Sequence, residues 1–279
     1  MTTGIVLIIL SAAMLHATWN TIVKTAGDRT ATLGLVALGH VIPGLAMVAV
    51  LPLPAAESWP YLIASTVIHF GYFYMLGQAY KHGDLSVVYP IARGIVPALV
   101  SLWAMLFVGE ILPAQAWFGI ALIAVAIQIS SWAALRHGVG RAALFFALGT
   151  GFCISGYSLV DGVGVRLSGD TLSYWAWHSV LHIFITGFVA VRRGNAIMAL
   201  PRRTWMIGIL GGMVSMTAYG LVLYAKNFAP LGAVSALRET SVIFAALIGF
   251  VFLGEGNWQR RLLAAVLMAG GVALIGLSI

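Results

Sequence analysis

The feature that most constrains this chain is a series of long, continuous apolar runs that repeat along its whole length. The hydrocarbon core of a bilayer is about 30 Å thick, and a helix crosses it with roughly 20 apolar residues. The runs cover residues 4–23, 31–53, 59–80, 85–108, 113–133, 141–161, 171–191, 203–225, 231–253 and 260–278. Their continuity disfavours a membrane β-barrel, whose strands alternate. We therefore predict an all-α integral membrane protein with ten transmembrane helices.

Composition agrees with a membrane-embedded chain. Hydrophobic residues make up 61% of it and charged residues only 8%, whereas a soluble domain carries about 25% charged residues. The formal net charge of +7 could suggest nucleic acid as a partner. The basic residues lie in short gaps between apolar runs, however, which is typical of topology signals. We therefore expect a lipid bilayer as partner and no nucleic acid.

The lysines and arginines are distributed unequally between the two predicted faces. The loops after the first, third, fifth, seventh and ninth predicted helices hold Lys24, Arg29, Lys81, Arg136, Arg141, Arg192, Arg193, Arg202, Arg203, Arg260 and Arg261. The opposite face holds Arg166 and Lys226. Because cytoplasmic loops are enriched in basic residues, the first face is predicted to be cytoplasmic, with both termini on the non-cytoplasmic side.

The chain also contains an internal repeat, visible when it is shifted against itself by 145 residues. The coinciding residues are Tyr74 and Tyr219, Lys81 and Lys226, Arg93 and Arg238, and FVGE (107–110) and FLGE (252–255). Chance explains leucine on leucine, but it explains in-register Arg, Lys and Gly-Glu poorly. The repeat predicts two halves, 1–135 and 136–279. With five helices each, they are inverted relative to one another, as in secondary transporters that bind substrate between their halves.

Three segments carry a family resemblance. AYKHGDLSVVYPIARGIVPALVSLWAMLFVGE (79–110), ALRETSVIFAALIGFVFLGE (236–255) and LHATWNTIVK (15–24) resemble the drug/metabolite transporter superfamily, EamA branch. The resemblance covers the chain as two EamA-type five-helix repeats. It implies a secondary active transporter of the bacterial inner membrane, proton-coupled or exchanging, that works by alternating access. These families carry amino acids, sugars, nucleotides, cations and drugs, so the substrate stays open.

Three charged residues lie inside predicted helices. Arg93, Arg238 and Glu239 are each about nine residues from a helix start, which at 1.5 Å per residue is roughly 13 Å deep. A charge near the midplane is costly and usually faces a cavity or a partner. We predict that the three bind substrate and that Glu239 also takes part in proton coupling. The alternative is a structural ion pair between Arg93 and Glu239.

Polar and aromatic residues on neighbouring predicted helices complete the candidate site. The further substrate-binding candidates are Trp19, Asn20, Tyr74, Tyr89, Tyr157, Trp175 and Tyr219, and His16 and His178 are further candidates for proton coupling. His16, Trp19 and Asn20 share one helix face through their i, i+3, i+4 spacing, as a cavity wall or as an interfacial anchor. Asp161 is interpreted as a solvated carboxylate near the end of its helix.

The charges and aromatic rings point to two substrate classes. Aromatic faces attract organic ammonium groups, and Glu239 could complete a cation site. The two arginines favour a carboxylate or phosphate. An amino acid or similar small zwitterion satisfies both sets and is our first expectation. Choline-like or drug-like cations are the alternative, and the sequence allows a monomer or a homodimer.

The main alternative from another class is a membrane haem or redox protein, because His178 and His182 are spaced i, i+4. His16, His40 and His69 show no matching spacing. The sequence contains no G-x-S-x-G or H-E-x-x-H motif of a hydrolase. We therefore expect no enzyme activity, no cofactor and no metal.

Overall fold

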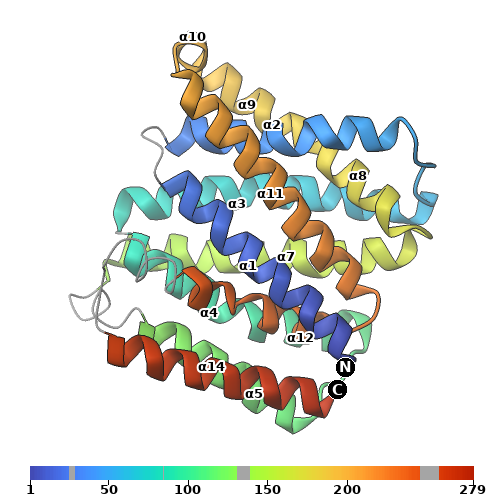
Figure 1. Cartoon of the computed structure of the whole chain (residues 1–279), viewed down its shortest axis with the longest axis vertical. Helices are drawn as coiled ribbons and strands as arrows, with labels where there is room; N and C mark the ends of the chain where they lie inside the picture. Colours follow the sequence, from blue (N-terminus) through green and yellow to red (C-terminus); the bar gives the residue numbers. More distant parts are fainter. Residues whose placement is uncertain (25–28, 84, 131–138, 246–257) are drawn as a thin grey trace.

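The computed structural model describes residues 1–24, 29–83, 85–130, 139–245 and 258–279. These residues fold into helices and contain no β-strand (Figure 1). The helices are α1 Thr3–Lys24, α2 Arg29–Val48, η1 Ala56–Ser58, α3 Trp59–His82, α4 Leu85–Trp103, η2 Ala104–Val108, α5 Ala114–Ser130, α7 Arg141–Leu167, α8 Thr171–Leu181, α9 Ile183–Arg193, α10 Asn195–Met198, α11 Arg202–Lys226, α12 Leu231–Arg238 and α14 Trp258–Ser278.

Six helical segments in the described ranges are long and apolar enough to cross a membrane. They are Thr3–Asn20, Ala31–Val48, Val87–Val108, Arg141–Leu167, Thr171–Arg193 and Arg202–Lys226. Two shorter apolar helices, Ala114–Ile129 and Leu262–Ser278, pack along each other as parts of α5 and α14. The prediction of an all-helical integral membrane protein is confirmed.

Two predicted helices end earlier in the structure. The run 31–53 becomes α2, which ends at Val48, because Pro52 and Pro54 disfavour helical backbone at the residues before them. The run 231–253 becomes α12, which ends at Arg238, so the prediction of one continuous helix there is wrong. Its part beyond residue 245, which includes the FLGE motif, lies outside the described residues.

Of two other predicted helices, one is longer in the structure and the other is broken into two. The helix predicted over 141–161 continues to Leu167 as α7, which places Asp161 inside it. The run 171–191 forms α8 and α9, which meet at His182. Both departures alter the site described below, since Asp161 and His182 belong to it.

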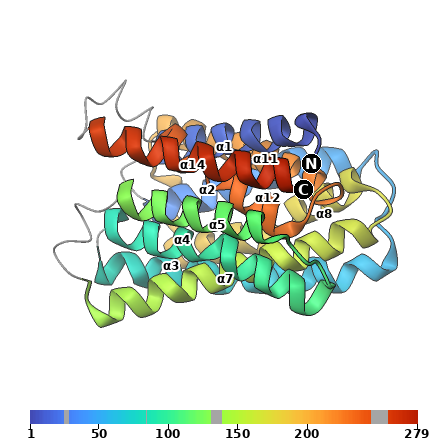
Figure 2. The same cartoon turned by 90° about the horizontal axis from the view of Figure 1, so that it is seen from below.

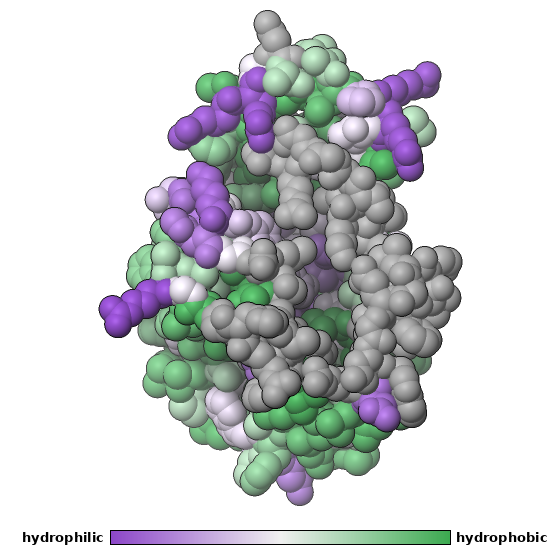
Figure 3. All heavy atoms as spheres, turned by 90° about the vertical axis from the view of Figure 1, so that its left-hand side faces the viewer, coloured by the Kyte–Doolittle hydropathy of each residue, from purple (hydrophilic) through white to green (hydrophobic). Residues whose placement is uncertain are grey.

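The two ends of the molecule have different surfaces. Both termini lie together at one end, in two views at right angles (Figures 1 and 2). Exposed bases lie at the ends of helices on the opposite side, where Figure 3 shows hydrophilic side chains. They are Lys81, Arg141, Arg192, Arg193, Arg202 and Arg203. This is the basic face that the loop composition predicts.

Helices α2 and α11 cross at a point where two glycines meet. A Cβ on Gly39 would overlap the carbonyl oxygen of Ile209, and one on Gly212 would overlap the carbonyl oxygen of Val36. Because the side chain of glycine is a single hydrogen atom, the two backbones can touch here, as they do at small residues in membrane helix pairs. Gly39 and Gly212 together thus permit the close approach of α2 and α11.

We predict that Gly39→Ala and Gly212→Ala each lower the melting temperature of the purified protein by several degrees. The added methyl group meets rigid backbone, and overpacking of this kind costs about 1–3 kcal/mol. Gly187→Ala is the matched control, because a Cβ there meets no atom within 4 Å. Equal effects at Gly187 and Gly212 would contradict the close crossing.

Candidate functional site

The centre of the candidate site is an ion pair between α4 and α12. The Nε of Arg93 donates a hydrogen bond to Oε2 of Glu239 over 2.8 Å. Their side chains are 4% and 1% exposed, so the pair is shielded from solvent. The Arg93 guanidinium also lies 5.8 Å from the centre of the Tyr89 ring, one turn earlier on α4. The structure thus forms the ion pair that the sequence offered as the alternative to two separate ligand contacts.

Glu239 sits at a break in its helix. Helix α12 ends at Arg238, and residues 239–240 form a turn before a helical segment resumes over 241–245. The amides of Glu239 and Thr240 donate to carbonyls three residues back, at 3.1 Å each. The Thr240 hydroxyl also donates to the carbonyl of Leu237 (2.7 Å). A tightened, interrupted helix at membrane depth is a form that transporters use at binding sites.

Arg238 differs from Arg93 in its partners. Its guanidinium lies over the Tyr219 ring, 5.6 Å from the ring centre. Within the described ranges no protein group forms a hydrogen bond or an ion pair with it. Arg238 is nevertheless buried. It is therefore a buried cation with hydrogen-bond donors available to a ligand.

Asp161 is a further site residue, and the prediction that it is solvated is wrong. It is fully buried rather than solvated at a helix end, because α7 continues beyond it. The Tyr174 hydroxyl donates to its Oδ1 (3.0 Å), and the Tyr219 hydroxyl donates to its Oδ2. His178 Nε2 lies 3.6 Å from the same Oδ2. The one sequence signal for this carboxylate is its i, i+4 spacing from Tyr157.

Lys226 is also inside the protein rather than in a loop. Its side chain is buried, and Nζ donates to the carbonyl of Ser158 over 2.8 Å. The ammonium lies 5.6 Å from the centre of the Tyr219 ring. The prediction of Lys226 as a topology signal is therefore wrong, since the last turn of α11 places it against α7. Tyr219 contacts both buried cations, Arg238 and Lys226.

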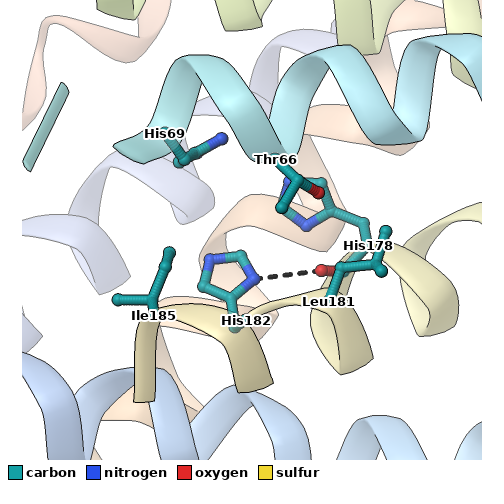
Figure 4. A pocket seen from close by; sticks show the side chains of 6 residues that line it. All are labelled: Thr66, His69, His178, Leu181, His182 and Ile185. Carbon is teal, nitrogen blue, oxygen red and sulfur yellow. Dashed lines mark hydrogen bonds between the residues drawn. The ribbon is translucent and has the colours of Figure 1, made fainter. Parts of the chain in front are cut away.

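Four imidazoles gather beside Asp161, and we name them the histidine cluster: His40, His69, His178 and His182. Ring centres are 4.5 Å apart for His40 and His182, 5.0 Å for His178 and His182, and 5.5 Å for His69 and His178. Figure 4 shows three of them around a pocket between α3 and the junction of α8 and α9. The other lining residues are Thr66, Leu181 and Ile185.

The cluster is not arranged as a metal centre. In the part of the chain that the structure describes, no three His, Cys, Asp or Glu side chains are placed to hold a metal ion. The Nδ1 atoms of His69 and His182 are each bonded to a backbone carbonyl one turn earlier, at 2.8 Å and 3.0 Å. These bonds orient the His69 and His182 rings through Nδ1.

Helix α8, which carries His178, begins at a capped end. The hydroxyl and the amide of Ser173 donate to the carboxylate of Asp170, over 2.6 Å and 2.8 Å. The hydroxyl bond is the largest influence, and together these bonds hold the pKa of the Asp170 carboxyl below its usual range. An ionised carboxylate at the start of α8 satisfies its first amides and suits the helix dipole.

The remaining predicted site residues fall into two groups, of which the first contacts other site residues. Tyr157 is buried beside Tyr219, with ring centres 6.3 Å apart. Trp19 and Asn20 on α1 both donate to His16, to its ring and its carbonyl, and His16 is in electrostatic range of Arg93 and Arg238.

Two predicted candidates lie apart from that group. The Trp175 indole donates to the carbonyl of Met216 over 3.1 Å and rests on Gly220, so it packs α8 against α11. Tyr74 is 60% exposed, and its side chain points to the outside of α3. The structure therefore does not bring Tyr74 into the candidate site, because its helix turns another face inward.

A second polar network ties three connections together near the end that holds the termini. Arg166 Nη1 donates to Oε1 of Glu110 (2.6 Å), and Oε2 accepts from the amide of Leu231 (2.7 Å). Arg166 also donates to the carbonyls of Lys226 and Ala229, at 2.7 Å and 3.0 Å. This network joins the segment after η2 to the end of α7 and the start of α12.

These features define a multi-pass helical membrane protein with buried charges between its helices. Residues 141–277 match the EamA-like transporter family, so the chain carries an EamA-like transporter domain, consistent with the drug/metabolite transporter superfamily. The resemblance found in the sequence is confirmed. The fold is similar to that of a solved structure titled "Crystal structure of protein", with a TM-score of 0.79, 17% identity and 99% of each chain covered. No curated protein matches the chain.

We predict that Arg93→Gln and Glu239→Gln each strongly destabilise the protein, by about 3–5 kcal/mol, because either change leaves a buried charge without its partner. The double variant is expected to be less destabilised than the sum of the single variants. Thermal unfolding in detergent measures all three variants. Arg238→Gln is the control, because this substitution leaves no ion-pair partner unpaired in the described residues. Additive effects of the two single changes would contradict the coupling.

Proposed function

We propose that this chain is a secondary active transporter that moves a small zwitterion, such as an amino acid, by alternating access. The observation that carries the proposal is the charge arrangement at the break after α12. Arg93 and Glu239 neutralise each other, while Arg238 stands beside them with free donors. A site with one uncompensated cation favours a ligand that brings a carboxylate.

The same arrangement disfavours a choline-like or drug-like cation. Such a ligand would need Glu239 as its counter-charge, and Arg93 already occupies that carboxylate at 2.8 Å. A zwitterion places its carboxylate on Arg238. Its ammonium can then share Glu239 with Arg93 or lie against the rings of Tyr89 and Tyr219. His16, Trp19, Asn20 and Tyr157 line the neighbouring helices of this proposed site.

Opposed helix directions support two inverted repeats. The 145-residue shift relates α3 to α11, α4 to α12 and α5 to α14. In Figure 1 the members of each pair run in opposite directions. Helix α3 packs on α7 while α11 packs on α1, which is the exchange that a pseudo-two-fold axis would produce. We propose halves at 1–135 and 136–279 that rock around the site, with ten helices in all.

Orientation follows from the charge distribution. We propose that the end with exposed bases faces the cytoplasm and that the termini lie outside, in a bacterial inner membrane. Of the two basic residues first assigned to the outer face, Lys226 is buried and Arg166 is bonded to Glu110. Neither is a free loop charge, so the difference in exposed basic residues between the two faces is larger than the sequence count indicates. A single chain holds both halves of the site, and a monomer suffices.

We propose that the Glu110–Arg166 network is the outer closure of the carrier. It joins residues of both proposed halves at the end opposite the exposed bases. Alternating access requires such a contact to form in one state and break in the other. The bond from Leu231 also anchors the start of α12, whose far end carries Arg238.

We predict that Glu110→Gln speeds amide hydrogen exchange in residues 226–231. The substitution removes the charge that binds Arg166 and weakens the acceptor for the Leu231 amide, so this connection opens more often. Hydrogen–deuterium exchange by mass spectrometry measures the change. Glu57→Gln is the matched control, because Glu57 is exposed in η1. Unchanged exchange in Glu110→Gln would contradict a role in closure.

The substrate class is tested with a thermal-shift screen of the purified protein against amino acids, choline-like cations, organic acids and sugar phosphates. We predict that zwitterionic amino acids raise the melting temperature, since a ligand that binds the folded state stabilises it. Arg238→Gln is expected to reduce the apparent affinity at least about tenfold, the effect of losing a charge-assisted hydrogen bond of roughly 1.5–3 kcal/mol.

Two outcomes would contradict this assignment. A shift given by choline-like cations alone, lost in Glu239→Gln, would favour the cation alternative. A zwitterion shift that Arg238→Gln leaves unchanged would remove Arg238 from the site. Arg192→Gln is the control for a general loss of positive charge, because Arg192 is exposed at the end of α9.

A further inference from the structure

We propose that Asp161 and the histidine cluster form a proton-binding site, separate from the Arg93–Glu239 pair and connected to it through Tyr219. The inference rests on the proposed transport function, to which it adds a coupling ion and a location for that ion. It differs from the expectation that Glu239 and His16 bind the proton.

The cluster has groups that can accept a proton. Imidazole is the side chain whose charge changes most readily near neutral pH. The Nδ1 atoms of His40 and His178 are buried, and neither has a hydrogen-bond partner in the described part of the chain. A pocket lies directly between His69, His178 and His182 (Figure 4). Of the two residues with an unpartnered nitrogen, His178 lines this pocket. A buried nitrogen atom without a partner is uncommon, and a bound proton would make it a donor.

Asp161 supplies the counter-charge. Both of its oxygens accept hydrogen bonds from tyrosine hydroxyls, which suits an ionised carboxylate. His178 Nε2 is 3.6 Å from Oδ2, too far for a strong hydrogen bond but within ion-pair range. When a proton from water binds to His178, the net charge of the cluster rises by one. The new imidazolium then faces a carboxylate, which lowers the cost of a charge inside the membrane.

Titratable and charged groups surround His178 on every helix packed near it. They are Tyr157 and Asp161 on α7, Tyr174 on α8, His182 at the junction with α9, His40 on α2, His69 on α3, Tyr219 and Lys226 on α11, and Arg238 on α12. Among these, Lys226 and Arg238 oppose further positive charge. The single carboxylate and the two cations together limit the cluster to one bound proton.

Tyr219 connects this proton site with the proposed substrate site. Its hydroxyl donates to Asp161, its ring is 5.0 Å from the His178 ring, and the Arg238 guanidinium lies over it at 5.6 Å. A proton on His178 competes with Tyr219 for Asp161. The position of Tyr219 and its contact with Arg238 then depend on proton occupancy. The proton and the substrate therefore act on one shared side chain.

Glu239 is a poorer proton acceptor than this cluster for a structural reason. Arg93 binds its carboxylate directly, so protonating it would leave the Arg93 guanidinium unpaired in a buried place. His16 is close to Arg93 and Arg238, and its Nδ1 already accepts from Trp19. Asp161 lies about 9 Å from the end of α7 at Leu167, at 1.5 Å per residue.

The test is a count of protons bound by the detergent-purified, substrate-free protein as an unbuffered solution is taken from pH 8 to pH 5 with an indicator dye. We expect His178→Gln to bind about one proton fewer than wild type. His16→Gln tests the rival proton site on α1, and Tyr74→Phe is the matched control for the tyrosine variant below, because Tyr74 is 60% exposed on the outside of α3. Both are expected to bind as many protons as wild type.

Tyr219→Phe is a second variant that keeps the aromatic ring and tests the site should His178→Gln not fold. Removing the hydroxyl from Asp161 leaves the carboxylate more available to His178, so the midpoint of proton uptake moves to higher pH. An uptake curve identical to wild type in Tyr219→Phe, or a smaller proton uptake in His16→Gln but not in His178→Gln, would overturn the proposal. If those results were found but zwitterions still raised the melting temperature in the thermal-shift screen, the transport function would stand and only the proton site would be removed.

Discussion

The free-energy cost of an unpaired charge in a low-dielectric interior is the constraint on which the rest of the structure depends. Arg93 and Glu239 can both be buried only because α4 and α12 approach closely enough for a 2.8 Å contact. Asp161 is buried only because Tyr174 and Tyr219 reach it from two other helices. Each charge thus fixes the relative position of helices that apolar packing in lipid would leave free to slide.

Hydropathy predicted the helices well, because the length of an apolar run is a local property. Arg93, Arg238 and Glu239 were found for the same reason, as charges within such runs. The partners were not predictable in this way. Tyr174 and Tyr219 are 13 and 58 residues from Asp161 in the chain, so nothing near Asp161 marks it as buried. The break at Glu239 depends on hydrogen bonds three residues apart, which a hydropathy average does not detect.

Counting basic residues gave the correct basic face but misplaced one lysine. Lys226 follows an apolar run, as a loop lysine does, yet its ammonium turns back to the carbonyl of Ser158. A long flexible side chain at a helix end can bury its charge in this way when an acceptor is available. The predicted basic face rests on many residues, so one buried lysine does not change it, while the position of any one side chain depends on its neighbours. Lys81, at the matching position of the repeat, is exposed.

The positions related by the 145-residue shift differ most where the site is built. Tyr74 is 60% exposed, whereas Tyr219 lies between Asp161 and Arg238. Arg93 is paired and Arg238 is not, and Gly94 corresponds to Glu239. Two equivalent halves would present equivalent charges, which suits a symmetric ligand. A zwitterion, the substrate class proposed above, has unlike ends, so a site that distinguishes them needs differences at positions that the proposed duplication would make the same.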